Sequence, residues 1–123
     1  MAHKLLVVDD EVATVDMIAT FMEIVGYDMV SAHDGISALT MLELEQPDML
    51  ILDLMMPDMK GFEICRRIRQ QEHYTDLPIL IVSARTDDEA IAEAYDAGAN
   101  GYMTKPFDLN KLLGEIKRFL PDG

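Results

Sequence analysis

Residues 5–11 read Leu-Leu-Val-Val-Asp-Asp-Glu, four apolar residues in a row that end abruptly in three acids. A strand that is apolar without alternation is buried on both faces, as in a parallel sheet covered by helices. The pattern returns at Met49–Leu52 before Asp53 and at Ile79–Val82 before Ser83. These three runs predict the central strands of one parallel sheet.

Weaker apolar runs at residues 28–32 and 101–104 predict two edge strands. Between the strands, apolar residues recur at helical spacing in five segments. The first ends before Gly26, the second follows Asp34-Gly35, the third runs from about Gly61 to Glu72, the fourth starts near Thr86 or Asp87 and ends at Gly98, and the fifth follows Asp108. Strands that alternate with helices predict an α/β domain with an open five-stranded parallel sheet and helices on both faces.

The composition sets limits on partners and location. The chain has 123 residues, half of them hydrophobic, which predicts one domain over residues 1–120 and a tail or linker start at 121–123. The net charge of −13 repels phosphate backbones and anionic membranes, so direct binding to nucleic acid or membrane is not expected. Because Cys65 is the sole cysteine and no apolar run could span a membrane, we expect a cytoplasmic protein.

Polar residues follow each central strand, at the edge where open α/β sheets bind ligands. If the first and third strands are neighbours, Asp9, Asp10 and Asp53 converge there, and three close carboxylates favour a bound cation such as Mg²⁺. Lys105 follows the fifth strand and can place its ammonium beside Asp53, with the Ser83 hydroxyl between them. This set suits phosphoryl transfer to the Asp53 carboxylate, which is the expected nucleophile.

Four segments carry a resemblance to a known family: Val7 to Glu11, Asp53 to Gly61, Ser83-Ala84 and Gly98 to Phe107. In this order and strand context, the whole chain resembles the receiver domain of bacterial two-component response regulators. The resemblance implies a CheY-like, flavodoxin-like (βα)5 fold with strand order 2-1-3-4-5. It also implies a phosphoacceptor switch whose only catalysis is its own phosphorylation and slow dephosphorylation.

The resemblance further implies a role for each site residue. Asp53 is the expected phosphoacceptor, and a sensor histidine kinase or a histidine phosphotransfer protein is the expected donor. Asp10 and the backbone carbonyl of Met55 are expected to join Asp53 as Mg²⁺ ligands, and Asp9 to act indirectly or through a water molecule. Lys105 is expected to neutralise charge on the transferred phosphoryl group.

A switch pair is implied as well. Ser83 is expected to turn toward the phosphate and Tyr102 to follow inward, which changes the output face made by the fourth helix, the fifth strand and the fifth helix. Met55 and Arg85 hold the positions that tune dephosphorylation, and their bulk favours slow to moderate loss of phosphate. The Lys105–Pro106 peptide bond is expected to be cis.

Other functions fit the sequence less well. A phosphatase or dehalogenase with an aspartyl intermediate would have a second Asp where Met55 stands, and a flavin carrier would have a phosphate loop where the acidic triplet lies. The alternative we retain is a degenerate, phosphate-independent receiver that acts as a protein-interaction module. The downstream target is either a separate protein or a covalently linked effector domain. Asn100-Gly101 departs from the paired acids of the winged-helix transcription-factor subfamily, which disfavours that subfamily.

Several side chains carry structural expectations. The fourth helix offers mainly alanines to packing, so we expect it to be weakly anchored and to move. Cys65 lies on an apolar stripe and is expected to be an inert core residue. Met56 and Met59 are expected to be exposed beside the site. Arg66, Arg67 and Arg69 are expected to form a solvated face of the third helix.

Overall fold

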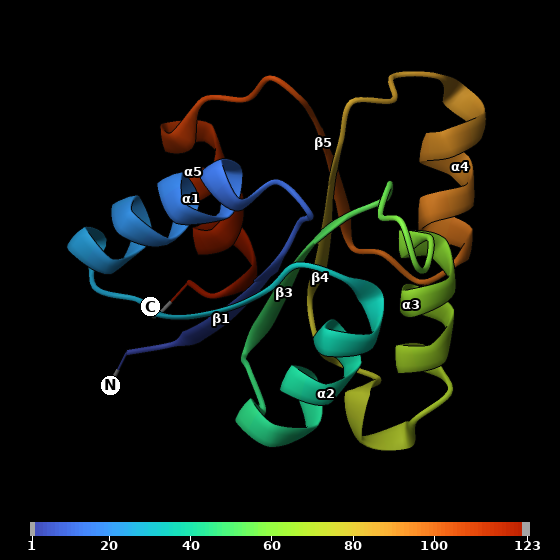
Figure 1. Cartoon of the computed structure of the whole chain (residues 1–123), viewed down its shortest axis with the longest axis horizontal. Helices are drawn as coiled ribbons and strands as arrows, with labels where there is room; N and C mark the ends of the chain where they lie inside the picture. The colour runs from blue at the N-terminus through green and yellow to red at the C-terminus, as the bar shows by residue number, and fades with distance from the viewer. Residues whose placement is uncertain (1, 122–123) are drawn as a thin grey trace.

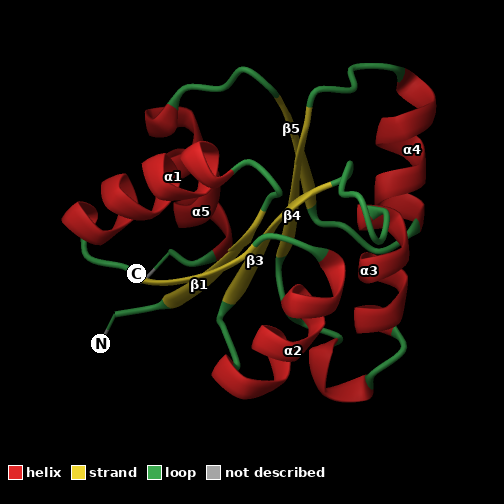
Figure 2. Cartoon of the chain, viewed as in Figure 1, coloured by secondary structure: helices red, strands yellow, loops and turns green. Residues whose placement is uncertain are grey.

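The computed structural model describes residues 2–121 as an open sheet of parallel strands with helices on both faces (Figures 1 and 2). The strands are β1 (Lys4–Val8), β2 (Asp28–Ala32), β3 (Met49–Asp53), β4 (Ile79–Ser83) and β5 (Gly101–Thr104). The helices are α1 (Val12–Val25), α2 (Gly35–Glu45), α3 (Gly61–Arg69), α4 (Asp88–Asp96) and α5 (Leu109–Phe119), with a short 3-10 turn at Glu72–Tyr74. The strand order is β2-β1-β3-β4-β5, which confirms the expected fold class.

The sheet separates two hydrophobic cores, because successive side chains along a strand point to opposite faces. Leu5, Val7 and Ile51 pack with α1 and α5 on one face, whereas Leu6 and Leu52 pack with α2, α3 and α4 on the other. Figure 1 shows this division, with the two groups of helices on opposite sides of the strands. Every residue of β3 and β4 is buried. Since one buried Leu or Ile stabilises by about 1.5–3 kcal/mol, the central strands form a rigid base for the site.

The strand register brings the carboxyl ends of the strands together at one rim. Val8 pairs with Leu52 across β1 and β3, and Asp53 pairs with Val82 across β3 and β4. Ser83, the last residue of β4, lies opposite the last residue of β5. Residues that follow these positions therefore share the same end of the sheet.

Helix α3 ends at Arg69, earlier than the predicted end at Glu72. The prediction that Arg69 is solvated is wrong, because its guanidinium donates hydrogen bonds to the carbonyl of Gly98 at 2.9 Å, the carbonyl of Tyr74 at 2.7 Å and Oδ1 of Asn100 at 2.7 Å. Helical spacing cannot show that the α4–β5 loop folds back over the end of α3. Arg69 therefore ties three segments together.

The other two arginines of α3 are exposed, as predicted. Arg66 pairs with Glu93 of α4 at 3.4 Å, and Arg67 pairs with Glu63 one turn back at 3.2 Å. Surface ion pairs of this kind contribute about 0–1 kcal/mol each. The link from α3 to α4 through Arg66 is thus much weaker than the one through Arg69.

Helix α4 packs mainly through small side chains, as its sequence predicts. Ala90 and Ala94 are its buried residues, and Asp87 caps its start by accepting a hydrogen bond from the Ala90 amide at 3.1 Å. Small side chains bury little apolar area, so α4 gains less from packing than its neighbours do. That α4 moves during function stays a prediction.

The loop between β3 and α3 corrects a second prediction. Met56 is buried, with 7% exposure, and belongs to the core between the sheet and helices α2 to α4. Met59 is partly buried against the same core, whereas Met55 is 52% exposed. The loop turns back toward the core at Met56, which a sequence pattern does not reveal. Cys65 is buried as predicted, and burial raises the pKa of its thiol to about 11, so it is unreactive.

Candidate functional site

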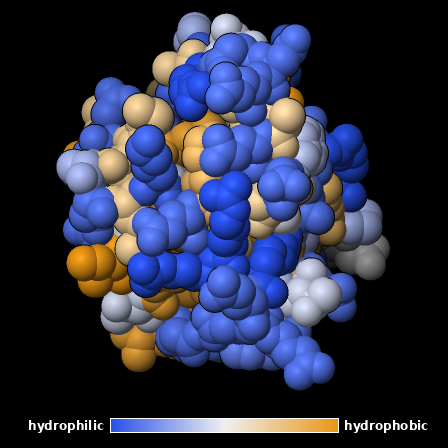
Figure 3. All heavy atoms as spheres, turned by 90° about the vertical axis from the view of Figure 1, so that its right-hand side faces the viewer, coloured by the Kyte–Doolittle hydropathy of each residue, from blue (hydrophilic) through white to orange (hydrophobic). Residues whose placement is uncertain are grey.

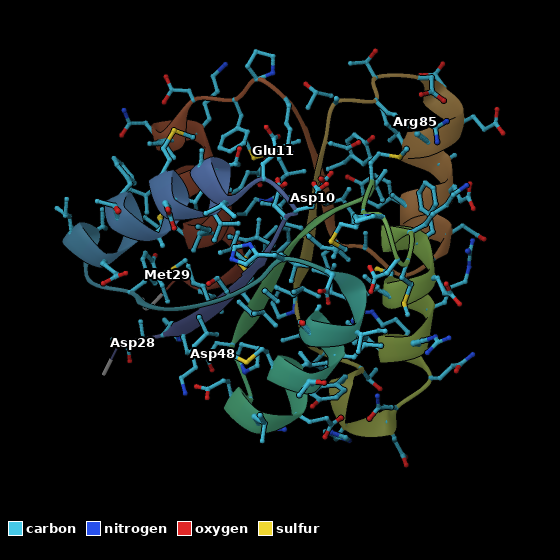
Figure 4. The ribbon with its side chains drawn as sticks, in the orientation of Figure 1. Asp10, Glu11, Asp28, Met29, Asp48 and Arg85 are labelled. Atoms are coloured by element: carbon cyan, nitrogen blue, oxygen red, sulfur yellow. The ribbon has the colours of Figure 1, made fainter. Side chains whose placement is uncertain are left out.

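Three carboxylates converge after β1 and β3. Carboxylate oxygens of Asp9, Asp10 and Asp53 all lie within 4.8 Å of one another. Asp9 and Asp53 are 4% and 6% exposed, whereas Asp10 is open to solvent. Figure 4 shows Asp10 at the carboxyl end of β1, with Asp28 and Asp48 at the opposite end of the sheet. The convergence that the sequence predicts is therefore present at the expected edge.

Lys105 supplies a positive charge to this group from the loop after β5. Its Nζ lies 2.6 Å from Oδ2 of Asp9, 3.5 Å from Oδ2 of Asp53 and 3.7 Å from Oε1 of Glu11. The Lys105 amide donates to the Ser83 carbonyl at 2.8 Å, which fixes where the side chain starts. The Lys105–Pro106 bond is cis, as expected. The ammonium thus lies beside Asp53, as predicted, and is closer still to Asp9.

Backbone amides orient the two buried carboxylates. Oδ1 of Asp9 accepts a hydrogen bond from the Glu11 amide at 2.9 Å, and Oδ1 of Asp53 lies 3.3 Å from the Met55 amide that donates to it. Nδ1 of His33 lies 3.2 Å from the Asp9 carbonyl, on the side of the site where β2 ends. Each carboxylate therefore keeps a second oxygen for Lys105 or for a cation.

The electrostatics of the site favour an added cation. Burial raises the pKa of Asp53, the charge of Asp9 raises it further, and Lys105 opposes both without cancelling them. Burial alone would lower the pKa of Lys105, but its hydrogen bond to Asp9 and the nearby carboxylates raise it overall. The ammonium of Lys105 is thus shared by Asp9, Asp53 and Glu11, and Asp10 adds a further carboxylate beside Asp9 and Asp53. Oxygen ligands of this type fit a hard divalent ion such as Mg²⁺ better than a softer metal.

Ser83 ends β4 at this rim, and Tyr102 lies on the neighbouring strand β5, opposite Ile81. Ser83 is fully buried, and its Oγ accepts a hydrogen bond from the Arg85 amide at 3.2 Å. The half-buried Tyr102 donates its hydroxyl hydrogen to the Arg85 carbonyl at 2.8 Å. The Arg85 side chain turns away to Asp87, at 2.8 Å, and Figure 4 shows it at the start of α4. The backbone of Arg85 therefore joins the predicted switch residues to the first turn of α4.

Sequence reasoning missed Asp58, which lies in the loop between β3 and α3. Its carboxylate accepts hydrogen bonds from the backbone amides of Gly35 at 2.8 Å and Ile36 at 3.0 Å, at the start of α2. In the sequence, an acid between Pro57 and Met59 is typical of an ordinary turn residue. No sequence pattern indicates that the start of α2 lies within hydrogen-bonding distance of it. Only the folded arrangement of α2 and this loop shows the contact.

An open (βα)5 sheet with three clustered carboxylates, a lysine and a serine at its carboxyl rim is typical of one class of signalling domain. The family model of the response regulator receiver domain matches residues 5–117, and the chain belongs to this family. The expectation drawn from the four sequence segments is thereby confirmed.

Individual relatives agree with the family. The chain is 40% identical to the response regulator MprA of Mycobacterium bovis, over 98% of this chain and 51% of that protein. It is 36% identical to the DNA-binding dual master transcriptional regulator RpaA of Synechocystis, over 95% of this chain and 48% of that protein. The chain therefore spans about half the length of these curated relatives.

Solved structures agree with the fold. The chemotaxis protein CheY4 of Vibrio cholerae superposes with a TM-score of 0.92 at 34% identity, over 97% of this chain and 99% of that one. Within residues 2–121, no helix is both long and apolar enough to cross a membrane.

Proposed function

We propose that the chain works as a phosphoacceptor switch in a two-component phosphorelay, with Asp53 as the acceptor and Mg²⁺ as the cofactor. The observation that carries the proposal is the position of the buried Asp53 carboxylate, which lies beside Asp9 and Asp10 and 3.5 Å from Nζ of Lys105. A sensor histidine kinase or a histidine phosphotransfer protein is the proposed donor. Residues 1–120 are the proposed receiver domain, followed by a tail or linker from residue 121.

The proposed chemistry is a phosphoryl transfer onto a carboxylate oxygen of Asp53. A bond from that oxygen to phosphorus forms while the bond from phosphorus to the donor nitrogen breaks, and the donor imidazole keeps the electron pair. Lys105 holds a positive charge 3.5 Å from Oδ2 of Asp53, close enough to neutralise charge on the oxygens of the phosphoryl group during its transfer. The chain catalyses only its own phosphorylation and slow dephosphorylation and acts on no separate substrate.

Mg²⁺ would be held by Asp10, Asp53 and the Met55 backbone carbonyl, with Asp9 acting indirectly or through water. When bound, the ion neutralises charge on the phosphoryl oxygens. Asp9 already engages Lys105 at 2.6 Å and the Glu11 amide at 2.9 Å, which supports an indirect role for its carboxylate. The Asp10 side chain is exposed to solvent beside the other two carboxylates, which supports direct ligation.

The proposed switch begins at Ser83. An attached phosphate attracts the Ser83 hydroxyl, which now accepts from the Arg85 amide, and Tyr102 then leaves the Arg85 carbonyl and turns inward. These exchanges bias an equilibrium between two conformers of the face made by α4, β5 and α5. Figure 3 shows that hydrophilic side chains predominate on the side of the molecule formed by α3 and α4. Because α4 also belongs to the output face, we propose a protein target or linked effector that binds α4 through polar contacts.

Met55 and Arg85 are the proposed rate-tuning residues. Met55 is exposed beside the acidic group, where its side chain can hinder an attacking water molecule. Arg85 points to Asp87, so its guanidinium has to leave that pair before it could shield the phosphate. We propose slow to moderate dephosphorylation, governed chiefly by Met55. We propose no direct contact of this chain with nucleic acid or with a membrane.

Intact-mass spectrometry tests the proposed function. The chain and an Asp53→Asn variant are incubated with acetyl phosphate, with Mg²⁺ or with EDTA. The proposal requires one added phosphoryl group on the unaltered chain with Mg²⁺ and none on the variant or in EDTA. If the unaltered chain gains no phosphate while Mg²⁺ still binds, the alternative of a phosphate-independent interaction module takes its place.

A further inference from the structure

One side chain of the loop that follows Asp53 is hydrogen-bonded to the start of helix α2. Asp58 reaches the start of α2 and accepts hydrogen bonds from the Gly35 amide at 2.8 Å and the Ile36 amide at 3.0 Å. These two hydrogen bonds hold the pKa of Asp58 below its usual range, so the carboxylate is charged at neutral pH. Gly35 and Ile36 precede Asp58 by 23 and 22 residues, so the contact joins two distant segments of the chain.

Helix α2 and the loop also pack closely at this point. A Cβ at Gly35 would lie 2.7 Å from Cβ of Met59 and 3.3 Å from Oδ1 of Asp58. Any larger residue at this position would push the loop away from the helix. Met56 is buried in the core, and the Gly61 amide donates to the Leu54 carbonyl at 2.9 Å. The loop is therefore fixed at both of its ends and, through Asp58, in its middle.

Met55 contributes little to holding the loop, because its side chain is 52% exposed. Its amide lies 3.3 Å from Oδ1 of Asp53, at the long end of the hydrogen-bond range. The direction of the Met55 backbone carbonyl thus depends on what fixes the residues after it. Among those residues, Met56 is held by burial of its side chain, and Asp58, three positions after Met55, adds two hydrogen bonds from its side chain to the start of α2.

We propose that Asp58 is a positioning residue for the Mg²⁺ site: by binding the start of α2 it sets the orientation of the Met55 carbonyl. The inference rests on the proposed function, in which that carbonyl is a metal ligand. Asp58 itself touches neither the metal nor the phosphate. Groups that orient a metal ligand affect the affinity for the metal, and their loss typically weakens it by about 10–100-fold.

A matched control is present on the same helix. Asp34 is the N-cap of α2, and its Oδ1 accepts a hydrogen bond from the Ser37 amide at 2.7 Å. Asp34→Ala and Asp58→Ala each remove one carboxylate acceptor from the start of α2, but only Asp58→Ala frees the loop. Any effect that comes merely from a weakened α2 therefore appears in both variants.

The experiment measures the Mg²⁺ dissociation constant of the full chain by titration calorimetry, together with amide hydrogen exchange over residues 54–60 without metal. Asp58→Ala is expected to weaken Mg²⁺ binding about tenfold and to speed exchange in the loop. Asp34→Ala is expected to change the dissociation constant less than twofold. With acetyl phosphate, Asp58→Ala should raise the half-saturating Mg²⁺ concentration and leave the rate at saturating Mg²⁺ nearly unchanged.

Each outcome decides the proposal. Equal Mg²⁺ affinity of Asp58→Ala and the unaltered chain, or an equal loss in both variants, overturns it. Should Asp58→Ala not fold, Asp58→Asn keeps one acceptor oxygen and the same shape, and it must then show a smaller but measurable loss of affinity. If the unaltered chain binds no Mg²⁺ or takes no phosphate, the proposed function itself has failed. If the unaltered chain does both and Asp58→Ala binds Mg²⁺ equally well, only the role proposed for Asp58 has failed.

Discussion

Replacing Lys105 by Met should reveal how much the stability of the acidic group depends on the ammonium beside it. At an effective dielectric constant of about 20, the 2.6 Å contact with Asp9 corresponds to an attraction of about 6 kcal/mol and the 3.5 Å contact with Asp53 to about 5 kcal/mol. Desolvation of all three groups offsets most of this attraction. The contact with Glu11 adds little, because that carboxylate is 66% exposed.

Removing one partner of a buried ion pair typically lowers stability by about 3–5 kcal/mol. Because the Lys105 side chain keeps 18% exposure, we take the lower end, about 3 kcal/mol. For a domain of this size, that loss lowers the melting temperature by about 10 °C. Mg²⁺ should restore more stability in Lys105→Met than in the unaltered chain, since it enters a group with no competing cation. At a concentration 100 times the dissociation constant, the ion adds about 2.7 kcal/mol.

Urea unfolding followed by circular dichroism, in EDTA and in Mg²⁺, measures both effects. Lys111→Met serves as the control, because Lys111 is an exposed lysine of α5 outside the site. The reasoning is refuted if Lys105→Met is as stable as the control in EDTA. It is equally refuted if Mg²⁺ stabilises the variant no more than the unaltered chain.

Three further predictions concern stability. Because burial and Asp9 raise the pKa of Asp53, the folded chain disfavours its charged form, so Asp53→Asn should raise the melting temperature in EDTA at neutral pH. That gain should vanish in acid, where the carboxyl is protonated in both states, and calorimetry across pH checks the sign. Tyr102→Phe removes the 2.8 Å hydrogen bond to the Arg85 carbonyl and should lower the free energy of unfolding by about 1 kcal/mol, as measured by urea unfolding. An unchanged unfolding midpoint would contradict this expectation. Arg69→Ala should cost about 2–3 kcal/mol, clearly more than alanine at an exposed arginine of the same helix, and an equal effect would show that the tie is weak.

The fold could be predicted from the sequence because its central strands are buried on both faces. Uninterrupted apolar runs such as Met49–Leu52 leave few alternatives, and the acids and serine that end them mark the functional rim. The resemblance to receiver domains, and not the apolar pattern, made the first and third strands neighbours, and with that strand order the convergence of Asp9, Asp10 and Asp53 could be predicted.

The contacts that could not be predicted from the sequence involve loops that fold back onto helices or strands distant in the chain. Arg69 has the charge and spacing of a surface residue, and only the path of the α4–β5 loop brings the Gly98 carbonyl and Oδ1 of Asn100 within its reach. Met56 and Asp58 lie in one turn, yet one enters the core and the other reaches α2. Patterns of period two or 3.6 describe strands and helices, and they carry no information on such contacts.

The two ends of helix α4 are held unequally, and this has a mechanical consequence. Arg69 binds the Gly98 carbonyl beyond its last turn, whereas its first turn is joined to the site through Asp87 and the backbone of Arg85. If α4 is held at its C-terminal end and displaced at its N-terminal end, the helix tilts about the held end. The displacement of each residue then grows with its distance from that end. For nine residues, about 13 Å of helix, a tilt of about 10° moves the first turn by about 2 Å and leaves the last turn almost still. We therefore expect a partner to sense the switch at Asp88 and Glu89 and to gain almost nothing from contacts near Asp96.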